Sequence, residues 1–209
     1  MYKRQEINDP FFLATLITIP GFAELESLFE KVDPIRIYRE SIDFQVLIAN
    51  EILQELRVIA KNLFGKIDQE WPIGKGERKL LGTIWFYLSL SGDRNVQRNC
   101  VESIAHSSMT ISRAALGALK PLDNSLTEEA SNLFYNLWKE NPVVLDSWFA
   151  YEASRPHKRG INVIEKLLSH PNFDWKDTKS WQNDPKAVQY WIKNIKDKRY
   201  PDNFTEKTY

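Results

Sequence analysis

The residues from Ser125 to Ala153 constrain the fold more than any other stretch, because they specify two consecutive helices with a tight corner between them. Ser125 and Glu128 have the spacing of a capping box, in which each side chain accepts from a free backbone N–H at the helix start. At the corner, Asn141 is a good N-cap and Pro142 suits the first helical position. Apolar residues recur at helical spacing before and after the corner: Leu126, Ala130, Leu133, Phe134, Leu137 and Trp138, then Val144, Leu145, Trp148 and Phe149.

The same helical spacing continues in the first half of the chain. Asp33-Pro34 predicts another cap-and-proline start, and the apolar pattern that follows runs to about Phe64 and ends at Gly65. Its length favours a central helix with a break near Ser41. One face of this helix is predicted to carry Phe44, Leu47, Ile48, Ile52, Leu56, Ile59 and Leu63.

Shorter apolar stripes predict the remaining helices. They are Phe22, Leu25, Leu28, Phe29 and Val32; Leu80, Leu81, Ile84, Trp85 and Leu88, closed by Ser91-Gly92; Val96, Cys100, Val101 and Ile104 after the cap Asp93; Met109 to Leu119; Ile161, Ile164, Leu167 and Leu168; and Ala187, Val188, Trp191, Ile192 and Ile195. No stretch alternates like a strand, and the helices outnumber those of a four-helix bundle. We therefore predict an all-α fold, an irregular α-solenoid of the HEAT/armadillo-like kind built from antiparallel helix pairs.

Composition narrows the class of protein. Lys plus Arg equals Asp plus Glu at 28 each, so net charge favours neither nucleic acid nor an anionic membrane as a partner. The single cysteine, Cys100, excludes an internal disulfide and fits a reducing compartment. No signal peptide or membrane-spanning apolar run is present. A cytoplasmic protein is the expectation.

Four stretches resemble the C-terminal helical domain of bacterial aminopeptidase N, a zinc alanyl aminopeptidase of the gluzincin family. They are Phe134, Tyr135, Trp138 and Lys139 with Pro142 to Asp146, Trp148 and Phe149; Ile19-Pro20 with Val32-Asp33-Pro34, Ile37, Arg39 and Glu40; Met109-Thr110 with Ala114 to Leu116, Ala118 and Leu119; and His170-Pro171 with Phe173. They occur in the family's order and cover residues 10–175. The resemblance implies a domain that packs over the zinc-bearing thermolysin-like domain, closes the catalytic chamber and controls peptide access.

The sequence departs from this family after Phe173. The family pattern has an Asn-Pro-Asn-Arg segment and further helices there, whereas this chain continues as Asp174-Trp175-Lys176 and ends after about forty residues. We therefore divide the chain into the family-type helical domain, 10–175, and a divergent tail, 176–209, with one amphipathic helix. That helix is expected to fold back over the stripe before it and bury Trp191.

The chemistry of a zinc peptidase is missing from the sequence. Such a site needs His-Glu-x-x-His, with both histidines one helical turn apart. The histidines His106, His157 and His170 stand alone, and a turn or surface histidine is favoured over a metal ligand for each. Cys100 lies on an apolar stripe, which favours a buried inert thiol over a nucleophile. We assign no catalytic, metal or substrate-binding residue, and zinc is implied only for the catalytic domain of the parent enzyme.

Three other features have both a functional and a structural interpretation. Glu128 and Glu129 resemble an acid/base pair, yet carboxylates in a first helical turn usually serve to stabilise the helix through a favourable interaction with its dipole. Arg155 with His157, Lys158 and Arg159 could bind phosphate, but a solvated loop is favoured. The tryptophans Trp138 and Trp148 lie within the apolar stripes, which favours core packing over a stacking platform.

Two functions from different classes remain open. The first is the cap domain of a zinc aminopeptidase, with the thermolysin-like domain as its partner, peptides as indirect ligands and no activity of its own. The second is a free-standing helical-repeat scaffold that binds a protein or peptide in its concave groove.

Overall fold

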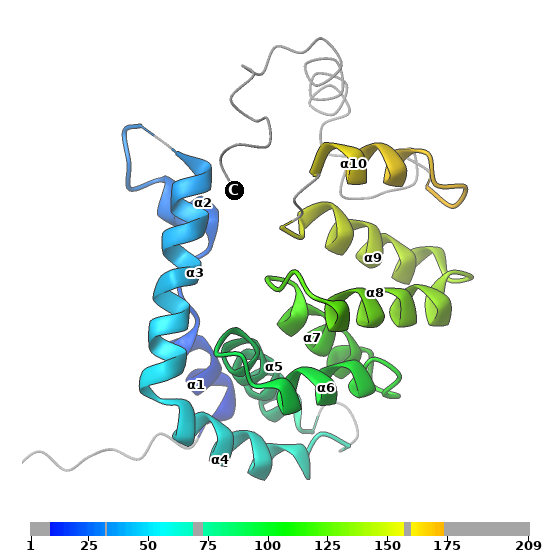
Figure 1. The fold of residues 1–209 in the computed structure, drawn as a ribbon. Helices are drawn as coiled ribbons and strands as arrows, with labels where there is room; N and C mark the ends of the chain where they lie inside the picture. Colours follow the sequence, from blue (N-terminus) through cyan, green and yellow to red (C-terminus); the bar gives the residue numbers. More distant parts are fainter. Residues whose placement is uncertain (1–8, 32, 69–72, 157–159, 174–209) are drawn as a thin grey trace, which may run out of the picture. The chain divides into compact units, whose positions relative to one another are not determined.

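The computed structural model describes residues 9–31, 33–68, 73–156 and 160–173, and within them every element is an α-helix (Figure 1). In chain order the helices are α1 (Pro10–Ile17), α2 (Phe22–Glu26), α3 (Pro34–Glu51), α4 (Leu53–Phe64), α5 (Lys75–Leu90), α6 (Arg94–Ser103), α7 (Met109–Leu119), α8 (Ser125–Trp138), α9 (Pro142–Ser154) and α10 (Gly160–Leu168). The predicted all-α class is confirmed. The tail 176–209, with Trp191, lies outside the described residues, so its fold-back remains a prediction.

The chain divides into two compact units, Met1–Leu137 and Trp138–Tyr209. In the first unit α5 is the central helix, and α1, α3, α4, α6 and α7 all pack against it (Figure 1). In the second unit α10 packs against α9. Successive helices joined by short loops in this way form the armadillo-like arrangement expected from the sequence.

The apolar stripe of α5 forms the centre of the core. Leu81, Ile84 and Leu88 are fully buried, and each such side chain contributes roughly 1.5–3 kcal/mol when it leaves water. The facing helices contribute side chains that are equally buried: Cys100 of α6 and Ile104 at its C-terminal end, and Ile111, Ala115 and Leu119 of α7. The predicted stripe of α5 is therefore correct.

Buried hydroxyl and amide groups hold the helix connections in place. Ser112 Oγ donates to the Ile104 carbonyl over 2.7 Å, and Gln97 Nε2 donates to the Ser89 carbonyl over 3.0 Å. Both carbonyls lie near helix ends, where intrahelical partners run out, and the Ser89 carbonyl also accepts from Gly92 N over 3.1 Å. The two bonds thus satisfy the buried Ser112 hydroxyl and Gln97 amide N–H, which would destabilise the fold if they were left without a hydrogen-bond partner.

The predicted helix starts at Asp33, Asp93 and Asn141 are confirmed. Asp33 accepts from Arg36 N over 3.0 Å, and Asn141 accepts from Val144 N over 3.3 Å. Asp93 caps α6 with one oxygen, while its other oxygen lies 2.8 Å from Arg57 of α4. The Asp93 carboxylate therefore both caps α6 and forms an ion pair with α4.

The predicted cap of α8 is wrong by one position. Asn124 Oδ1 accepts from Leu126 N over 3.0 Å and from Thr127 N over 3.1 Å, so Asn124 is the N-cap. Ser125 is already the first helical residue. Both residue types cap well, and the buried bond from Thr127 Oγ1 to the Leu119 carbonyl, 3.2 Å, fits the register in which Asn124 is the cap.

The predicted break near Ser41 is also wrong. Ser41 lies inside α3, and the chain bends instead at Ile52, where φ is −116° and ψ is 27°. Figure 1 shows α4 leaving α3 in a different direction from this point. No glycine or proline marks the bend, so packing of α4 against α5 sets it.

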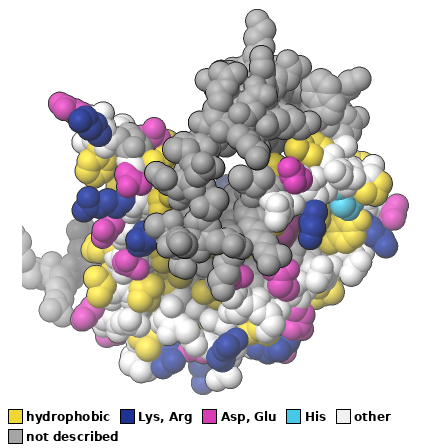
Figure 2. All heavy atoms as spheres, turned by 45° about the horizontal axis from the view of Figure 1, so that its top comes forward, with side chains coloured by type: hydrophobic (Ala, Val, Ile, Leu, Met, Phe, Trp, Pro, Cys, Tyr) yellow, Lys and Arg dark blue, Asp and Glu magenta, His cyan; other side chains and the backbone are white. Residues whose placement is uncertain are grey.

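The apolar residues that the sequence places on one face of α2 and α3 are largely exposed. Phe44 is 55% exposed and Leu47 is 63% exposed, while Ala49 is the one fully buried described residue of α3. Leu28 and Phe29 lie beyond the end of α2 and are exposed as well. Figure 2 shows hydrophobic side chains on the left, over these two helices.

Candidate functional site

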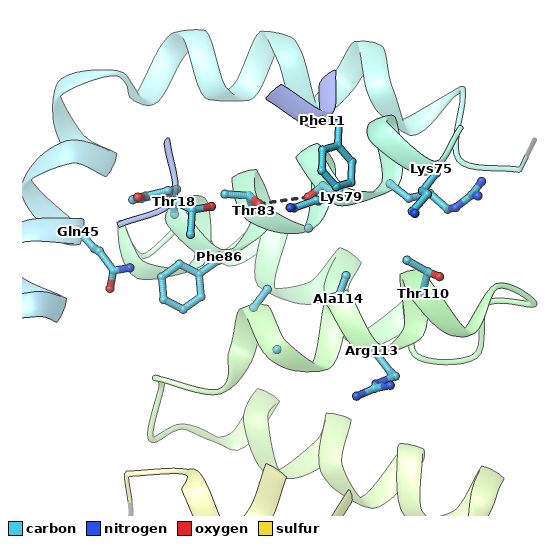
Figure 3. A pocket seen from close by; sticks show the side chains of 15 residues that line it. Phe11, Thr18, Gln45, Lys75, Lys79, Thr83, Phe86, Thr110, Arg113 and Ala114 are labelled. Carbon is cyan, nitrogen blue, oxygen red and sulfur yellow. Dashed lines mark hydrogen bonds between the residues drawn. The ribbon is translucent and has the colours of Figure 1, made fainter. Parts of the chain in front are cut away.

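A groove of about 710 Å³ opens in the first unit between α1, α5 and α7 (Figure 3). Helices α5 and α7 pack side by side and run in the same direction, since Figure 3 shows Lys75, at the start of α5, and Thr110, near the start of α7, at the same end of the groove, with Phe86 at the other end. Gln45 of α3 joins the second end. We call this cavity the α5–α7 groove.

One end of the α5–α7 groove is cationic. Lys75, Arg78 and Lys79 come from the first turns of α5, and Arg113 comes from α7. Arg78 is buried, and its Nη1 lies 3.4 Å from the Ile67 carbonyl oxygen, while the other three side chains are exposed. Among the described residues that line the groove there is no Asp or Glu.

Helix α1 closes one side of the cationic end. Lys79 Nζ lies 4.0 Å from the centroid of the Phe11 ring, a cation–π geometry, and Lys75 Nζ lies 5.8 Å from it. Figure 3 shows Phe11 and Lys79 together on one side and Arg113 on the other. The Tyr87 hydroxyl donates to the Ile17 carbonyl and fixes the far end of α1 on α5.

The floor of the groove is made of small residues. Gly82 and Ala114 meet where α5 and α7 pack, Gly117 and Ala118 of α7 also line the groove, and Phe86 supplies an apolar wall. Such a floor lets a ligand approach the helix backbone closely. The sequence analysis missed this site, although the spacing of Lys75, Arg78 and Lys79 at i, i+3 and i+4 was a visible signal of one basic helix face.

An aromatic cluster holds the second unit together. The Phe149 ring contacts Trp148, His170 and Phe173, with ring centroids 5.2, 5.3 and 5.1 Å apart. Phe149 is buried, whereas Trp148 is only half-buried. All four residues belong to the stretches that carried the family resemblance, and their contacts give that pattern a packing role.

The described histidines occupy turns. His106 Nδ1 accepts from Ser108 N over 2.9 Å, and its Nε2 lies 2.9 Å from Asp68 Oδ1. His170 Nδ1 accepts from Asn172 N over 3.1 Å, and partial burial lowers the pKa of His170. His157 lies outside the described residues.

No group of three or more His, Cys, Asp or Glu side chains in the described part of the chain is placed to hold a metal ion. Cys100 is buried, and this burial raises the pKa of its thiol to about 12. At neutral pH the thiolate needed for a nucleophile is therefore not formed.

The two charged features considered in the sequence have structural partners. Glu129 accepts from Arg98 Nη1 at 2.8 and 3.0 Å, which joins α8 to α6. Arg155 was expected in a solvated loop, but it is buried, and its Nη1 lies 3.4 Å from Glu152 Oε1. Lys158 and Arg159 lie outside the described residues.

The two tryptophans predicted to pack in the core are not fully buried. Trp138 and Trp148 are both half-buried, and Leu137 beside Trp138 is exposed. The buried anchors of the two stripes are instead Phe134 and Phe149. Among the described helices, none is both long and apolar enough to cross a membrane.

Comparison with known proteins gives a consistent set of relatives. The family model described as "Domain of unknown function (DUF3458_C) ARM repeats" matches residues 2–178. Aminopeptidase N of Haemophilus influenzae is 30% identical over an alignment of 170 residues, and the match covers 78% of this chain and 19% of that protein. Aminopeptidase N of Escherichia coli K12 is 25% identical over 167 residues, 79% of this chain and 19% of that protein.

A solved structure has the same fold. The crystal structure of Legionella pneumophila aminopeptidase A in complex with aspartic acid superimposes with a TM-score of 0.71 at 22% identity, over 83% of this chain and 22% of that one. The chain spans about a fifth of the length of the curated relatives that it matches.

Proposed function

Because the chain belongs to the DUF3458_C family of ARM-repeat domains, the C-terminal helical domain of bacterial aminopeptidase N, we propose that it caps the catalytic chamber of a zinc-dependent aminopeptidase. In this role it packs over a thermolysin-like domain and controls which peptides reach the metal. The zinc and its ligands belong to that domain. This chain supplies shape and binding surface, and no catalytic group.

The match over residues 2–178 is the observation that carries the proposal. The relatives named aminopeptidase N align with this chain over only 19–20% of their length, so the rest of each relative lies outside the aligned region. A helical domain within such a protein has a neighbouring domain to pack against. The thermolysin-like domain is the partner that the family resemblance implies.

The exposed apolar side of α2 and α3 supports docking. Phe22, Leu28, Phe29, Phe44 and Leu47 are each at least 43% exposed. Large exposed apolar areas on a folded domain are typical of surfaces that bind another protein. We infer that this side faces the partner domain.

The test begins with the chain alone. The purified 209-residue chain is expected neither to hydrolyse alanyl-anilide substrates nor to bind zinc stoichiometrically. One tightly held zinc per chain together with activity would overturn the proposal. Reading the coding sequence upstream of Met1 adds a direct check, because the cap role needs an in-frame His-Glu-x-x-His region.

Docking is then measured with variants of the exposed side. Phe44→Ser/Leu47→Ser should weaken co-purification with the separately expressed catalytic part of the same protein. The matched control is Val58→Ser, which removes an exposed apolar side chain from α4. Equal loss in both proteins would count against docking through α2 and α3.

A free-standing scaffold is the second candidate, and the α5–α7 groove favours it. This groove is formed within the first unit, so it can bind a ligand without any partner domain. An upstream region without the zinc motif, combined with peptide binding by the isolated chain, would support this function instead.

A further inference from the structure

We propose that the α5–α7 groove binds a carboxylate of a short peptide, with the basic residues at one end holding the carboxylate. The apolar residues further along the groove then contact the neighbouring part of the peptide. The choice of a peptide as the ligand rests on the proposed function. The choice of a carboxylate rests on the charges and the shape of the groove.

The charge of the groove is uncompensated on its exposed side. Lys75, Lys79 and Arg113 have no carboxylate oxygen within 4.0 Å among the described residues, whereas Arg57 and Arg98 elsewhere each have one at 2.8 Å. The whole chain has a net charge of +0, so this is a local concentration of positive charge. An anion in the groove would relieve the repulsion between these side chains.

Two helix N-termini add to the positive potential at the same end. α5 has 16 residues and starts at Lys75, and α7 has 11 residues and starts at Met109, next to the groove-lining Thr110. Each helix places partial positive charge at its first turn and favours an anion there. The basic side chains and the helix starts therefore act together.

The size of the groove favours a short peptide. A volume of about 710 Å³ lies within the range of roughly 300–1,000 Å³ that is usual for small-ligand sites. Nucleic acid needs a longer basic stripe, and the chain offers no excess positive charge for one. The Arg113 guanidinium can bind both oxygens of a planar carboxylate, and Phe86 with the small floor residues accepts apolar groups.

Gly117 gives a way to close the groove without damaging the fold. It lines the groove, and a Cβ built on it meets no atom within 4 Å. A larger side chain at this position would therefore project into the space that the peptide needs. Gly82, in contrast, has no such room.

The experiment measures peptide binding to the full 209-residue chain by isothermal titration calorimetry at low salt. The probes are Ala-Ala-Phe with a free C-terminal carboxylate, the same peptide as its C-terminal amide, and Ala-Glu-Phe amide. We expect the free acid to bind about tenfold or more tightly than Ala-Ala-Phe amide, because charged hydrogen bonds are lost in the amide. Binding of Ala-Glu-Phe amide at the strength of the free acid assigns side-chain carboxylates as ligands, and weak binding assigns the peptide C-terminus.

Variants locate the binding in the groove. Lys75→Gln/Arg113→Gln should lower the affinity for the free acid about tenfold, and Gly117→Leu should abolish binding. The matched control is Lys61→Gln/Arg94→Gln, which removes the same charge from exposed positions of α4 and α6 outside the groove. Thermal unfolding of each variant checks that it is folded.

Several results would overturn the proposal: equal binding of Ala-Ala-Phe as free acid and as amide, equal effects of the groove and control variants, or inorganic phosphate binding more tightly than the free-acid peptide. Absence of any peptide binding overturns it too. These outcomes are separate from a failure of the cap role. Peptide binding needs only this chain, whereas docking is measured with Phe44 and Leu47 on α3.

Discussion

Gly82 of α5 and Ala114 of α7 meet where the two helices pack, and a Cβ at position 82 would lie only 2.8 Å from the Ala114 Cβ. Atoms of this kind do not approach so closely in folded proteins, and the Ala114 Cβ is fixed to a helix backbone. The glycine therefore lets the central helix and α7 come together and form the floor of the α5–α7 groove.

Gly82→Ala is expected to destabilise the chain by about 1–3 kcal/mol, because overpacking between two helices outweighs the gain in helix propensity. The matched control is Gly117→Ala, where the new Cβ meets nothing and the propensity gain of up to about 1 kcal/mol should remain. Chemical denaturation followed by circular dichroism measures both. Equal stability of the two variants would show that α5 and α7 separate without cost.

Local chemistry explains which parts of the fold could be predicted. Asp33, Asp93 and Asn141 start helices through bonds to residues only two or three positions away, so the sequence alone contains the signal. The bend at Ile52 depends on packing against α5 and has no local signal. The choice of Asn124 over Ser125 as a cap is similar, since both residues suit the position.

The groove shows the same limit. The spacing of Lys75, Arg78 and Lys79 on one helix face is visible in the sequence, but their meeting with Arg113 and Phe11 depends on how α1 and α7 pack on α5. Likewise, the helical period identifies the apolar face of α3 without showing whether anything covers it. Phe44 therefore fits the predicted stripe and is still exposed.

Asn124→Ala should cost about 1 kcal/mol, because the N-terminal N–H groups of Leu126 and Thr127 lose their acceptor. Ser125→Ala, one residue later, should change stability by less than about 0.5 kcal/mol, since Ser125 is exposed. Urea unfolding distinguishes the two. The reverse order of effects would restore the capping box predicted from the sequence.

Cys100 should not react with Ellman's reagent in the folded protein at pH 8, because burial raises the pKa of its thiol to about 12. Reaction of the single thiol is expected only in guanidinium. As a positive control, Ser107→Cys places a second thiol at an exposed position and should react at once. Fast labelling of the unsubstituted chain would mean that α6 opens readily.

The raised pKa of Cys100 also predicts an alkaline loss of stability. Above the ordinary thiol pKa of 9.0 the unfolded chain's thiol ionises while the folded one stays protonated, so the unfolded state is stabilised relative to the folded state. The contribution is fully present below pH 9 and is lost as the pH rises toward about 12. The loss should be smaller in Cys100→Ala when the two are compared by urea unfolding at pH 8 and pH 10.

His170 should titrate below the ordinary histidine value of 6.5, because partial burial lowers its pKa. Its Nδ1 also accepts from Asn172 N, a bond that protonation removes. The neutral ring thus contributes stability above pH 6.5, and this contribution is lost as the pH falls through the folded pKa. NMR titration of its ring proton, assigned with His170→Gln, gives the midpoint, and a value of 6.5 or higher would contradict this account.

Phe149→Ala should be the most costly single truncation among the described residues of the second unit. Its ring is 6% exposed and contacts Trp148, His170 and Phe173, and removal of such a buried aromatic costs about 3–5 kcal/mol. Trp148→Ala should cost less, about 1–3 kcal/mol, because that side chain is only half-buried and its loss leaves a smaller cavity. Val143→Ala, at a position 80% exposed, is the control and should be nearly neutral.

Denaturation monitored by tryptophan fluorescence suits Phe149→Ala and the control, and circular dichroism suits Trp148→Ala. If Trp148→Ala proved as costly as Phe149→Ala, the tryptophan would be more deeply packed than its exposure indicates. Phe149 would then not be the main buried aromatic of α9.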